Sequence, residues 1–569
     1  MSECIKYDVV LVGAGPANLT LAYRLLQLAK KPIKIAIFEK GKAVGSHLLS
    51  GAVSNPRVIS KLFPNWMNSD FPLQGIVQES NLSLVSARRW ENLPSFATPP
   101  YFKKEGYAIL NLSDLATYMV RQIKELEQGK DGAIVDVFPG FAATSIIYDG
   151  NRVIGVRVDD TGDDESDICY GNVISFGDKG FLSREIVTKF NLSNNPQIYS
   201  VGVKEVWETN ESYEGKVWHT IGYPMEPGHF GGGFIYGCKN NKLAIGMVLS
   251  CAFQNPNIEP PQILQELKKH HYVQDMIRGG KLIKYGAAIL PEGGYYSMPE
   301  KFAVDGAILL GDACGTLDVK RFSGVDKAME SGYQAAESVL KALEDGDFSG
   351  TALGLFQENL MNGWVGQEIR NSRYFRQAFV DYPELNKKVI PGIIDSINAG
   401  KAPWYAVMKM GIKDPFRSLE LLNAKKMIEN PSDKGPVVYE EDRLSVSKGF
   451  KKAEKESPVG FDHSLLYSTA DVVFYANTHY EEDNNHIDEL DANVCANCIK
   501  EYDAAGYKTP CVGDCTADVH QTLDNGDYRY HSMALENCVQ CRTCEIVCPN
   551  SNLRVNAAMH GYGPDFSGM

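Results

Sequence analysis

The chain has 569 residues, of which 44% are hydrophobic and 22% charged, and its formal net charge is −14. This length exceeds one ordinary core and predicts roughly two to four domains, while the acidic balance argues against a broad basic surface for nucleic acid. We expect no signal peptide and no spanning segment, because no uninterrupted apolar run approaches the ~20 residues that a bilayer requires.

Residues 7–40 predict a strand, a glycine turn, a helix and a second strand. The apolar run YDVVLVGAG is typical of a buried parallel strand. The following ANLTLAYRLLQLA has apolar residues at helical spacing, and KIAIFEK predicts a second strand that ends near Glu39. This βαβ pattern predicts an α/β domain.

The turn GAGPAN at residues 13–18 predicts a dinucleotide site. Gly13 and Gly15 allow a tight turn and the close approach of a pyrophosphate to a helix N-terminus. Glu39 is placed to accept hydrogen bonds from ribose hydroxyls. Asn18 stands at the third glycine position, which implies looser helix packing or a side-chain contact to the backbone or ligand. A plain strand-to-helix turn is the alternative.

A long mixed region follows to about residue 415, with expected strands at 151–160 and 242–250. Within it, GAILLGDACG at 306–315 runs from an apolar strand into Gly311 and Asp312, and a helical pattern follows. This order can place a carboxylate and helix N-terminal amides near a flavin. We therefore assign both residues to the cofactor site, although an ordinary turn aspartate explains Asp312 equally simply.

Eight of the 13 cysteines lie between residues 495 and 548, after a polar, lysine-rich stretch at 434–460. A secreted disulfide framework does not suit a chain of this size without a leader, so metal ligation is the better interpretation. The run at 538–548 has the C-x2-C-x2-C-x3-C-P spacing of ferredoxins with two clusters, in which the fourth cysteine ligates the other cluster.

Upstream, the same order of cysteines recurs with twelve residues inserted between the second and third. The crossed rule predicts two [4Fe–4S] clusters, one held by Cys495, Cys498, Cys511 and Cys548 and one by Cys515, Cys538, Cys541 and Cys544. Zinc also accepts four cysteinates, and one cluster with spare cysteines is a third possibility. The unbroken spacing followed by proline favours two clusters.

The histidines form no nucleophile–base pattern. His219 and His229 flank TIGYPMEPG, and His270 and His271 are adjacent in a polar segment. We expect all four to be structural, and the chemistry to belong to cofactors.

Over nearly its whole length the chain resembles the electron transfer flavoprotein–ubiquinone oxidoreductase family and its nitrogen-fixation and electron-bifurcating relatives. The resemblance is carried by VGAGPANLTLAYRL, HLLSGAV, VGVKEVWE, HTIGYPM, FGGGFIYG, QNPNIEPP, YGAAILPEGGYYSMPE and GPDFSGM. It implies noncovalent FAD, an iron–sulfur cluster, a quinone acceptor and an electron transfer flavoprotein as donor.

The same resemblance, carried over residue by residue, points to Gly231 and Gly232 as quinone-binding residues. Glycines there would let a planar ring lie against the backbone. A flexible hairpin is the alternative interpretation of this GGG sequence.

The cysteines depart from the pattern of the single-cluster members. The four cysteines of those enzymes correspond here to Cys515, Cys538, Cys541 and Cys544, and the other four are additional. The chain therefore resembles the two-cluster branch of the family, or a fusion of its flavin and ferredoxin-like subunits.

The segment that matches the family's membrane-inserting stretch, residues 389–412, is interrupted by Asp395, Lys401 and Lys409. We expect an apolar patch near Val389–Ile397 and Trp404–Ile412 to contact a membrane monotopically. Amphipathic helices packed on the core or on a partner subunit are an equal alternative.

The expected fold combines α/β and α+β parts. A Rossmann-like FAD-binding domain comprises residues 1–200 and 280–345, and an inserted mixed β-sheet quinone domain, facing the membrane, comprises 201–280 and 346–433. A linker at 434–465 leads to a ferredoxin-like domain with two clusters at 466–569.

The expected function is electron transfer from an electron transfer flavoprotein, through the clusters and FAD, to a membrane quinone. The enzyme is expected on the cytoplasmic side of the membrane, as a peripheral or monotopic protein. Two alternatives stay open: an FAD-dependent reductase of geranylgeranyl double bonds fed by the clusters, and a non-catalytic relay subunit of a bifurcating complex.

Overall fold

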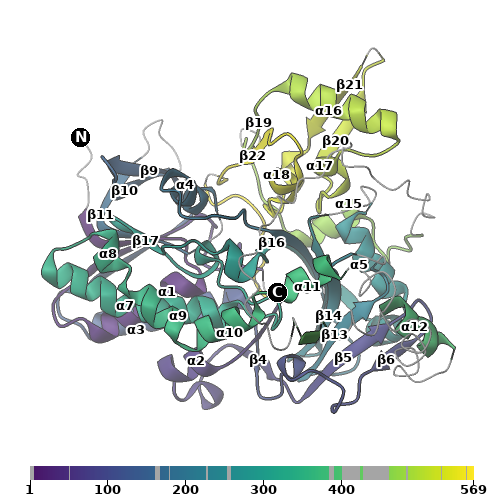
Figure 1. Cartoon of the computed structure of the whole chain (residues 1–569), viewed down its shortest axis with the longest axis horizontal. Coiled ribbons are helices and arrows are strands. Elements are labelled where there is room, and N and C mark those ends of the chain that lie inside the picture. The colour runs from purple at the N-terminus through teal and green to yellow at the C-terminus, as the bar shows by residue number, and fades with distance from the viewer. Residues whose placement is uncertain are drawn as a thin grey trace.

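The computed structural model describes most of the chain (Figure 1). The described residues are 6–49, 51–159, 167–177, 180–225, 229–252, 258–382, 390–399, 423, 425, 426, 428, 460–481, 485–526, 528–558 and 560–569. The predicted linker at 434–465 therefore lies outside the described residues up to residue 459, as does Trp404–Ile412.

The first sheet has the order β17-β18-β11-β1-β2-β8, with β10 and β9 joined through β11. Its strands are β1 (Lys6–Val12), β2 (Lys34–Glu39), β8 (Ile134–Pro139), β9 (Ala142–Asp149), β10 (Arg152–Asp159), β11 (Asp167–Phe176), β17 (Ala303–Val304) and β18 (Ala307–Leu309).

Parallel pairing defines the centre of this sheet, where β1 lies between β11 and β2. Val9, Val10 and Leu11 are fully buried, as expected for a parallel strand covered on both faces. Three long helices share the sheet's core: α1 (Pro16–Leu28), α3 (Leu112–Gln128) and α7 (Val325–Asp345). The predicted Rossmann-like βαβ unit is confirmed.

The second sheet is mainly antiparallel, in the order β16-β12-β15-β14-β13-β5-β6. Its strands are β5 (Glu79–Val85), β6 (Trp90–Asn92), β12 (Tyr199–Glu208), β13 (Lys216–Gly222), β14 (Gly231–Cys238), β15 (Lys242–Ser250) and β16 (Lys281–Pro291). Helix α5 (Pro260–Lys269) packs on β12 and β15. The GGG sequence therefore begins a regular strand, and the flexible-hairpin interpretation is wrong.

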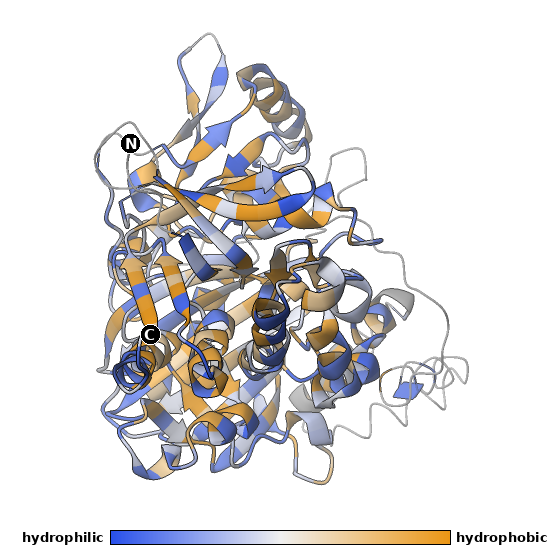
Figure 2. Ribbon diagram, turned by 90° about the vertical axis from the view of Figure 1, so that its left-hand side faces the viewer, coloured by the Kyte–Doolittle hydropathy of each residue, from blue (hydrophilic) through white to orange (hydrophobic). Residues whose placement is uncertain are grey.

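Shorter elements complete the two large parts. A small sheet has the order β3-β7-β4, from Ala52–Ser54, Ala108–Leu110 and Leu73–Ile76. The remaining helices are α2 (Arg57–Leu62), α4 (Phe181–Lys189), α6 (His271–Ile277), α8 (Gly350–Leu353), α9 (Leu355–Asn362), α10 (Trp364–Ser372), α11 (Phe375–Asp381) and α12 (Ile390–Asn398). Figure 2 shows helices with both apolar and polar sides, as expected of elements with one buried face.

The C-terminal domain lies above β16 in the view of Figure 1. Its elements are α15 (Thr469–Val473), β19 (Ile487–Glu489), α16 (Ala492–Ala505), α17 (Pro510–Gly513), β20 (His520–Asp524), β21 (Arg529–Met533), α18 (Thr543–Val547) and β22 (Leu553–Val555). It shares one hydrophobic core with that sheet, and the Tyr285 hydroxyl donates to the Thr516 carbonyl at 2.7 Å.

Two groups of elements belong to a different part of the structure from the one that the predicted domain boundaries gave them. Strands β5 and β6, expected in the FAD part, belong to the second sheet, because β5 pairs in parallel with β13. Helices α9 and α10, expected in the quinone part, bury Phe356, Leu360 and Val365 in the core of the first sheet. Local patterning does not reveal either long-range contact.

The membrane-facing stretch is described only at α12. Among the described residues, no helix is both long and apolar enough to cross a bilayer. Ile390, at the start of α12, reaches the large internal cavity, whereas Asp395 is exposed.

Candidate active site

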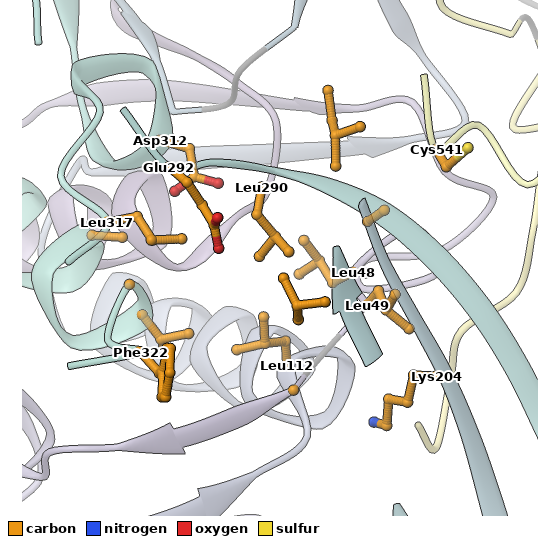
Figure 3. Close-up of a pocket in the computed structure, with 18 of the residues that line it drawn as sticks. Leu48, Leu49, Leu112, Lys204, Leu290, Glu292, Asp312, Leu317, Phe322 and Cys541 are labelled. Atoms are coloured by element: carbon orange, nitrogen blue, oxygen red, sulfur yellow. The ribbon is translucent and has the colours of Figure 1, made fainter. Parts of the chain in front are cut away.

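A cavity of about 600 Å³ lies where the two sheets and the C-terminal domain meet. Its lining includes Gly13 and Asp312 beside the first sheet, Gly231 in the second sheet, and Cys541 in the C-terminal domain. In the view of Figure 3, Asp312 and Cys541 lie on opposite sides, with Leu290 between them. The volume is within the range of ~300–1,000 Å³ typical of ligand and cofactor sites.

The glycine turn after β1 leaves space for a ligand. Gly13 has a φ of +88°, a left-handed conformation that favours glycine, and its N–H donates to the Phe38 carbonyl at 2.7 Å. A Cβ at Gly13 or Gly15 would meet nothing within 4 Å. Gly15 caps α1 without a side-chain hydrogen bond, and Pro16 at the first helical position has no N–H, so the amides of the residues that follow it can serve an anion. The turn fits a pyrophosphate.

Glu39, the last residue of β2, is buried in the cavity wall beside this turn. Its carboxylate accepts hydrogen bonds from the amides of Ala14 at 3.0 Å and Gly41 at 2.8 Å. A carboxylate has about four lone-pair sites, so these contacts orient the group and still allow it to accept from a ribose hydroxyl.

Asn18 takes a role at the third position of the glycine sequence. Its Nδ2 donates to the carbonyls of Val12 at 2.8 Å and Gly13 at 3.0 Å, and its Oδ1 accepts from the Ser175 hydroxyl at 2.8 Å. The predicted side-chain contact to the backbone is confirmed. Asn18 fixes the turn to strand β11 where a glycine would only permit close packing.

Gly311 and Asp312 lie in the turn between β18 and α7. Gly311 has a φ of +54°, and a Cβ there would come within 3.1 Å of Ala328 and 3.2 Å of Ala17, so this turn packs between α1 and α7. Asp312 lines the cavity, as Figure 3 shows, and so do Val325 and Asp326 at the start of α7. The start of α7 and the open glycine turn before α1 face the same cavity and together fit FAD.

Gly231 and Gly232 line the cavity from β14. A Cβ at Gly231 would overlap the Val248 carbonyl oxygen, and one at Gly232 would overlap the Thr220 carbonyl oxygen. The close approach of neighbouring strands therefore accounts for these glycines. Bulkier residues would displace β14 itself, so they cannot test ring binding alone.

The wall around these glycines is largely aromatic and includes a pair of polar side chains. Its rings include Phe102, Phe230, Phe234, Phe322, Phe375 and Phe379. The pair consists of His219 on β13 and Tyr236 on β14, which both line the cavity.

The first predicted cysteine set surrounds a small cavity of about 20 Å³ lined by Cys495, Cys498, Cys511 and Cys548. Burial, with the neighbouring thiols, raises the pKa of Cys498 to about 12, and burial raises that of Cys511 further. The raised pKa values of Cys495, Cys498 and Cys511 disfavour their thiolates, and a bound cation reverses that balance.

A histidine pair lies beside the first set. The ligand atoms of Cys511, His520 and His531 lie within 4.8 Å of one another. His531 already uses both ring nitrogens, one toward Glu489 at 2.6 Å and one toward His520 at 2.9 Å. The cysteines thus remain the better ligands.

The second predicted set is also brought together. Burial raises the pKa of Cys538 to about 12, and the thiols of Cys541 and Cys515 contribute to that rise. The pKa of Cys544 is raised well above its usual value by burial and by the thiols of Cys541, Cys538 and Cys515. Hydroxyls of Thr516 and Thr543 lie 3.2 Å from the Cys541 sulfur, as a thiolate acceptor would require.

This second set adjoins the large cavity, which the cysteine spacing did not reveal. Cys541 and Gln540 form part of its wall. The Ile289 amide on β16 donates to the Cys541 carbonyl at 3.3 Å, and Lys40 donates to Gln540 at 2.8 Å. No sequence signal marks this convergence of three separate segments.

Two family models match the chain. One, described as "ETF-QO, ubiquinone-binding", matches residues 199–290. The other, described as "Electron transfer flavoprotein-ubiquinone oxidoreductase, 4Fe-4S", matches residues 463–567. The first covers most of the second sheet and the second covers the whole cysteine region.

Curated relatives match over the whole chain. The electron transfer flavoprotein-ubiquinone oxidoreductase of Pseudomonas aeruginosa is 30% identical, covering 100% of this chain and 100% of the relative. The mitochondrial enzyme of Sus scrofa is 31% identical, covering 99% and 89%. That of Oryza sativa is 30% identical, covering 100% and 94%.

A solved structure supports the fold of the first part. A geranylgeranyl bacteriochlorophyll reductase-like protein from Thermoplasma acidophilum aligns with a TM-score of 0.55 at 18% identity. It covers 74% of this chain and 99% of its own. This likeness concerns the fold alone.

Proposed function

The chain belongs to the electron transfer flavoprotein–ubiquinone oxidoreductase family, and from this premise we propose that it carries electrons from an electron transfer flavoprotein, through two [4Fe–4S] clusters and FAD, to a membrane quinone. Membership in the family makes it an oxidoreductase. The number of clusters, the residues that hold each group and the membrane contact are our proposals.

The observation that carries the proposal is the shared cavity. Its wall includes Gly13 and Asp312 of the proposed FAD site, Gly232 of the proposed quinone site, and Cys541 of the proposed second cluster. A protein that passes electrons between these groups requires such proximity, whereas a plain binding protein does not.

Each carrier has its own proposed residues. The amides at Gly15 and the start of α1 bind the FAD pyrophosphate, Glu39 binds a ribose, and Asp312 lies toward the flavin end. FAD, when bound, exchanges one or two electrons and so couples one-electron clusters to a two-electron quinone. The two crossed cysteine sets provide eight ligands for two clusters.

The spatial order of the binding residues supports an order of transfer. The thiol of Cys511 in the first set helps to raise the pKa of Cys544 in the second set, so the two sets are neighbours. Cys541, also in the second set, lines the cavity wall. The second set therefore lies between the first set and the proposed FAD site. We propose that electrons enter at the first set.

The quinone assignment is tested with the purified holoprotein and the reduced electron transfer flavoprotein of its own host. We expect reduction of ubiquinone-1 or a menaquinone analogue that depends on this donor, because the family's acceptor is a quinone. A geranylgeranyl lipid is assayed in parallel. Turnover of the lipid with no quinone reduction would move the assignment to a lipid reductase, and cluster reduction without either turnover would indicate a relay subunit.

We also propose shallow membrane contact, since a long-tailed quinone stays in the bilayer and its pocket must open toward lipid. Ile390 of α12 lies at the cavity, which supports an opening near this helix. We expect the protein to float with liposomes, and Trp404→Glu to reduce flotation at least several-fold without lowering the melting temperature. A melting temperature that falls while flotation is unchanged would indicate a core position.

The control for this experiment is Phe474→Glu, the same chemical change at a ring that is 82% exposed on the C-terminal domain. We expect it to leave flotation unchanged. Equal losses in both variants would show a general charge effect and contradict the proposed patch.

A further inference from the structure

His219 is a buried polar group in the aromatic part of the cavity, and one of its ring nitrogens has no hydrogen-bond partner among the described residues. It is 5% exposed, and its ring stacks on Phe322, with centroids 5.4 Å apart and planes at 27°. Its Nε2 lies 3.0 Å from the Tyr236 hydroxyl. Among the described residues, its Nδ1 has no hydrogen-bond partner. A buried polar atom left without a partner is unfavourable, so such an atom calls for an explanation.

His219 lines the same cavity as Gly231 and Gly232, the proposed quinone-binding residues. His219 and Thr220 are consecutive on β13, and Thr220 pairs with Gly233 on β14. The Thr220 carbonyl is the group that a Cβ at Gly232 would overlap. His219 therefore lies next to the two glycines that line the same cavity.

The tautomer of the ring follows from its surroundings. Burial, with the nearby Lys104 ammonium, lowers the pKa of His219 to about 3, so the ring is neutral and carries one N–H. The buried Tyr236 hydroxyl lies 3.0 Å from the Nε2 of His219, where either atom can donate, and we take the hydroxyl as the donor. The single ring proton then lies on Nδ1, which becomes a donor that lacks an acceptor.

Lys104 adds positive charge beside this donor. It is 2% exposed, and its Nζ donates to the Arg321 carbonyl at 2.6 Å. Asp318 and Asp326 partly offset its charge, and Arg321 and Lys327 add to it. The side of the cavity at His219 is therefore suited to an oxygen on which negative charge develops.

We propose that the Nδ1–H of His219 donates a hydrogen bond to one carbonyl oxygen of a bound quinone and stabilises the negative charge that develops there during reduction. This inference rests on the proposed function, because it takes the cavity as the quinone site. The quinone takes up two electrons, supplied by the donor flavoprotein through the chain's carriers, and two protons from water, and both carbonyl groups become hydroxyls. His219 keeps its proton, and Tyr236 is a positioning residue that fixes the tautomer.

Two substitutions separate the roles of the two ring nitrogens. The amide nitrogen of asparagine can replace Nδ1, whereas the longer glutamine reaches the position of Nε2. His219→Asn therefore keeps a donor toward the quinone and loses Tyr236, and His219→Gln keeps Tyr236 and loses the donor.

The experiment uses holoprotein with ubiquinone-1 labelled with ¹³C at either carbonyl, observed by infrared difference spectroscopy. We expect one carbonyl band to be shifted to lower frequency in the wild type and in His219→Asn, and the shift to be absent in His219→Gln. We also expect His219→Gln to lower kcat by about 10²-fold, the effect of losing one preorganised donor, with little change in KM. Ferricyanide reduction, which involves no carbonyl, should be unchanged. Tyr236→Phe should give a smaller loss in kcat.

Two results would overturn the inference and leave the proposed function standing. One is a wild-type protein that binds and reduces quinone with both carbonyl bands unshifted. The other is equal loss of kcat and of FAD in the asparagine and glutamine variants, which would show a packing role. A wild-type protein that neither binds nor reduces quinone would overturn the proposed function, and this inference with it.

Discussion

We expect Gly15→Val to yield a folded protein without FAD. The backbone of Gly15 has φ −82° and ψ 167°, which any residue adopts, and a Cβ there meets no atom of the chain within 4 Å. A valine side chain would instead occupy the space proposed for the pyrophosphate. Loss of two charge-assisted hydrogen bonds, each worth about 1.5–3 kcal/mol, weakens binding by roughly 10²–10⁴-fold.

The measurement is flavin content after desalting, with FAD affinity determined by titration of the stripped protein. Gly460→Val is the matched control, because a Cβ at Gly460 also meets nothing within 4 Å and the residue is exposed. We expect the control to keep its flavin. A Gly15→Val protein with full flavin would place the nucleotide elsewhere.

The second large effect is expected from two cysteine variants, each of which should remove one of the two proposed clusters. We expect Cys548→Ser to remove the cluster held by Cys495, Cys498 and Cys511, and Cys515→Ser to remove the cluster held by the 538–544 run. Each variant should fall from about eight irons to about four, since each cubane holds four. Both should lose nearly all donor-dependent quinone reduction.

Iron content and the electron paramagnetic resonance spectra of the reduced proteins distinguish the two losses. The two variants should keep different residual spectra, and these should sum to that of the wild type. If Cys548→Ser removed the same signal as Cys541→Ser, the crossed assignment would be wrong. Four irons in the wild type would reduce the proposal to one cluster with spare cysteines.

The local parts of this fold were predictable, because their signals lie within short segments. The order β1-α1-β2 follows from an apolar run, a glycine turn and a helical period, and the structure confirms it at Lys6–Glu39. The cysteine spacing likewise fixes which residues approach one another, since ligands two or three positions apart share a turn.

The contacts between distant segments were not predictable in the same way. Glu79 on β5 pairs with Lys216 on β13, and parallel pairing across such a separation leaves no local pattern. The cavity wall joins His219 to Cys541 by the same long-range packing. His219 therefore looked like an ordinary structural histidine in the sequence, because neither its neighbour Tyr236 nor its incomplete bonding has a sequence signature.

The hydrophobic core that the second sheet shares with the C-terminal domain affects the rate of electron transfer between them. Domains joined only by small polar interfaces move relative to one another by default. The rate of electron transfer from a carrier on such a domain is then limited by the rate of the domain motion. Here Tyr285, Phe566 and Val539 are buried in one continuous apolar interior, so the spacing between the cysteine ligands and the cavity is set by packing. Transfer across it should then be insensitive to the viscosity of the medium.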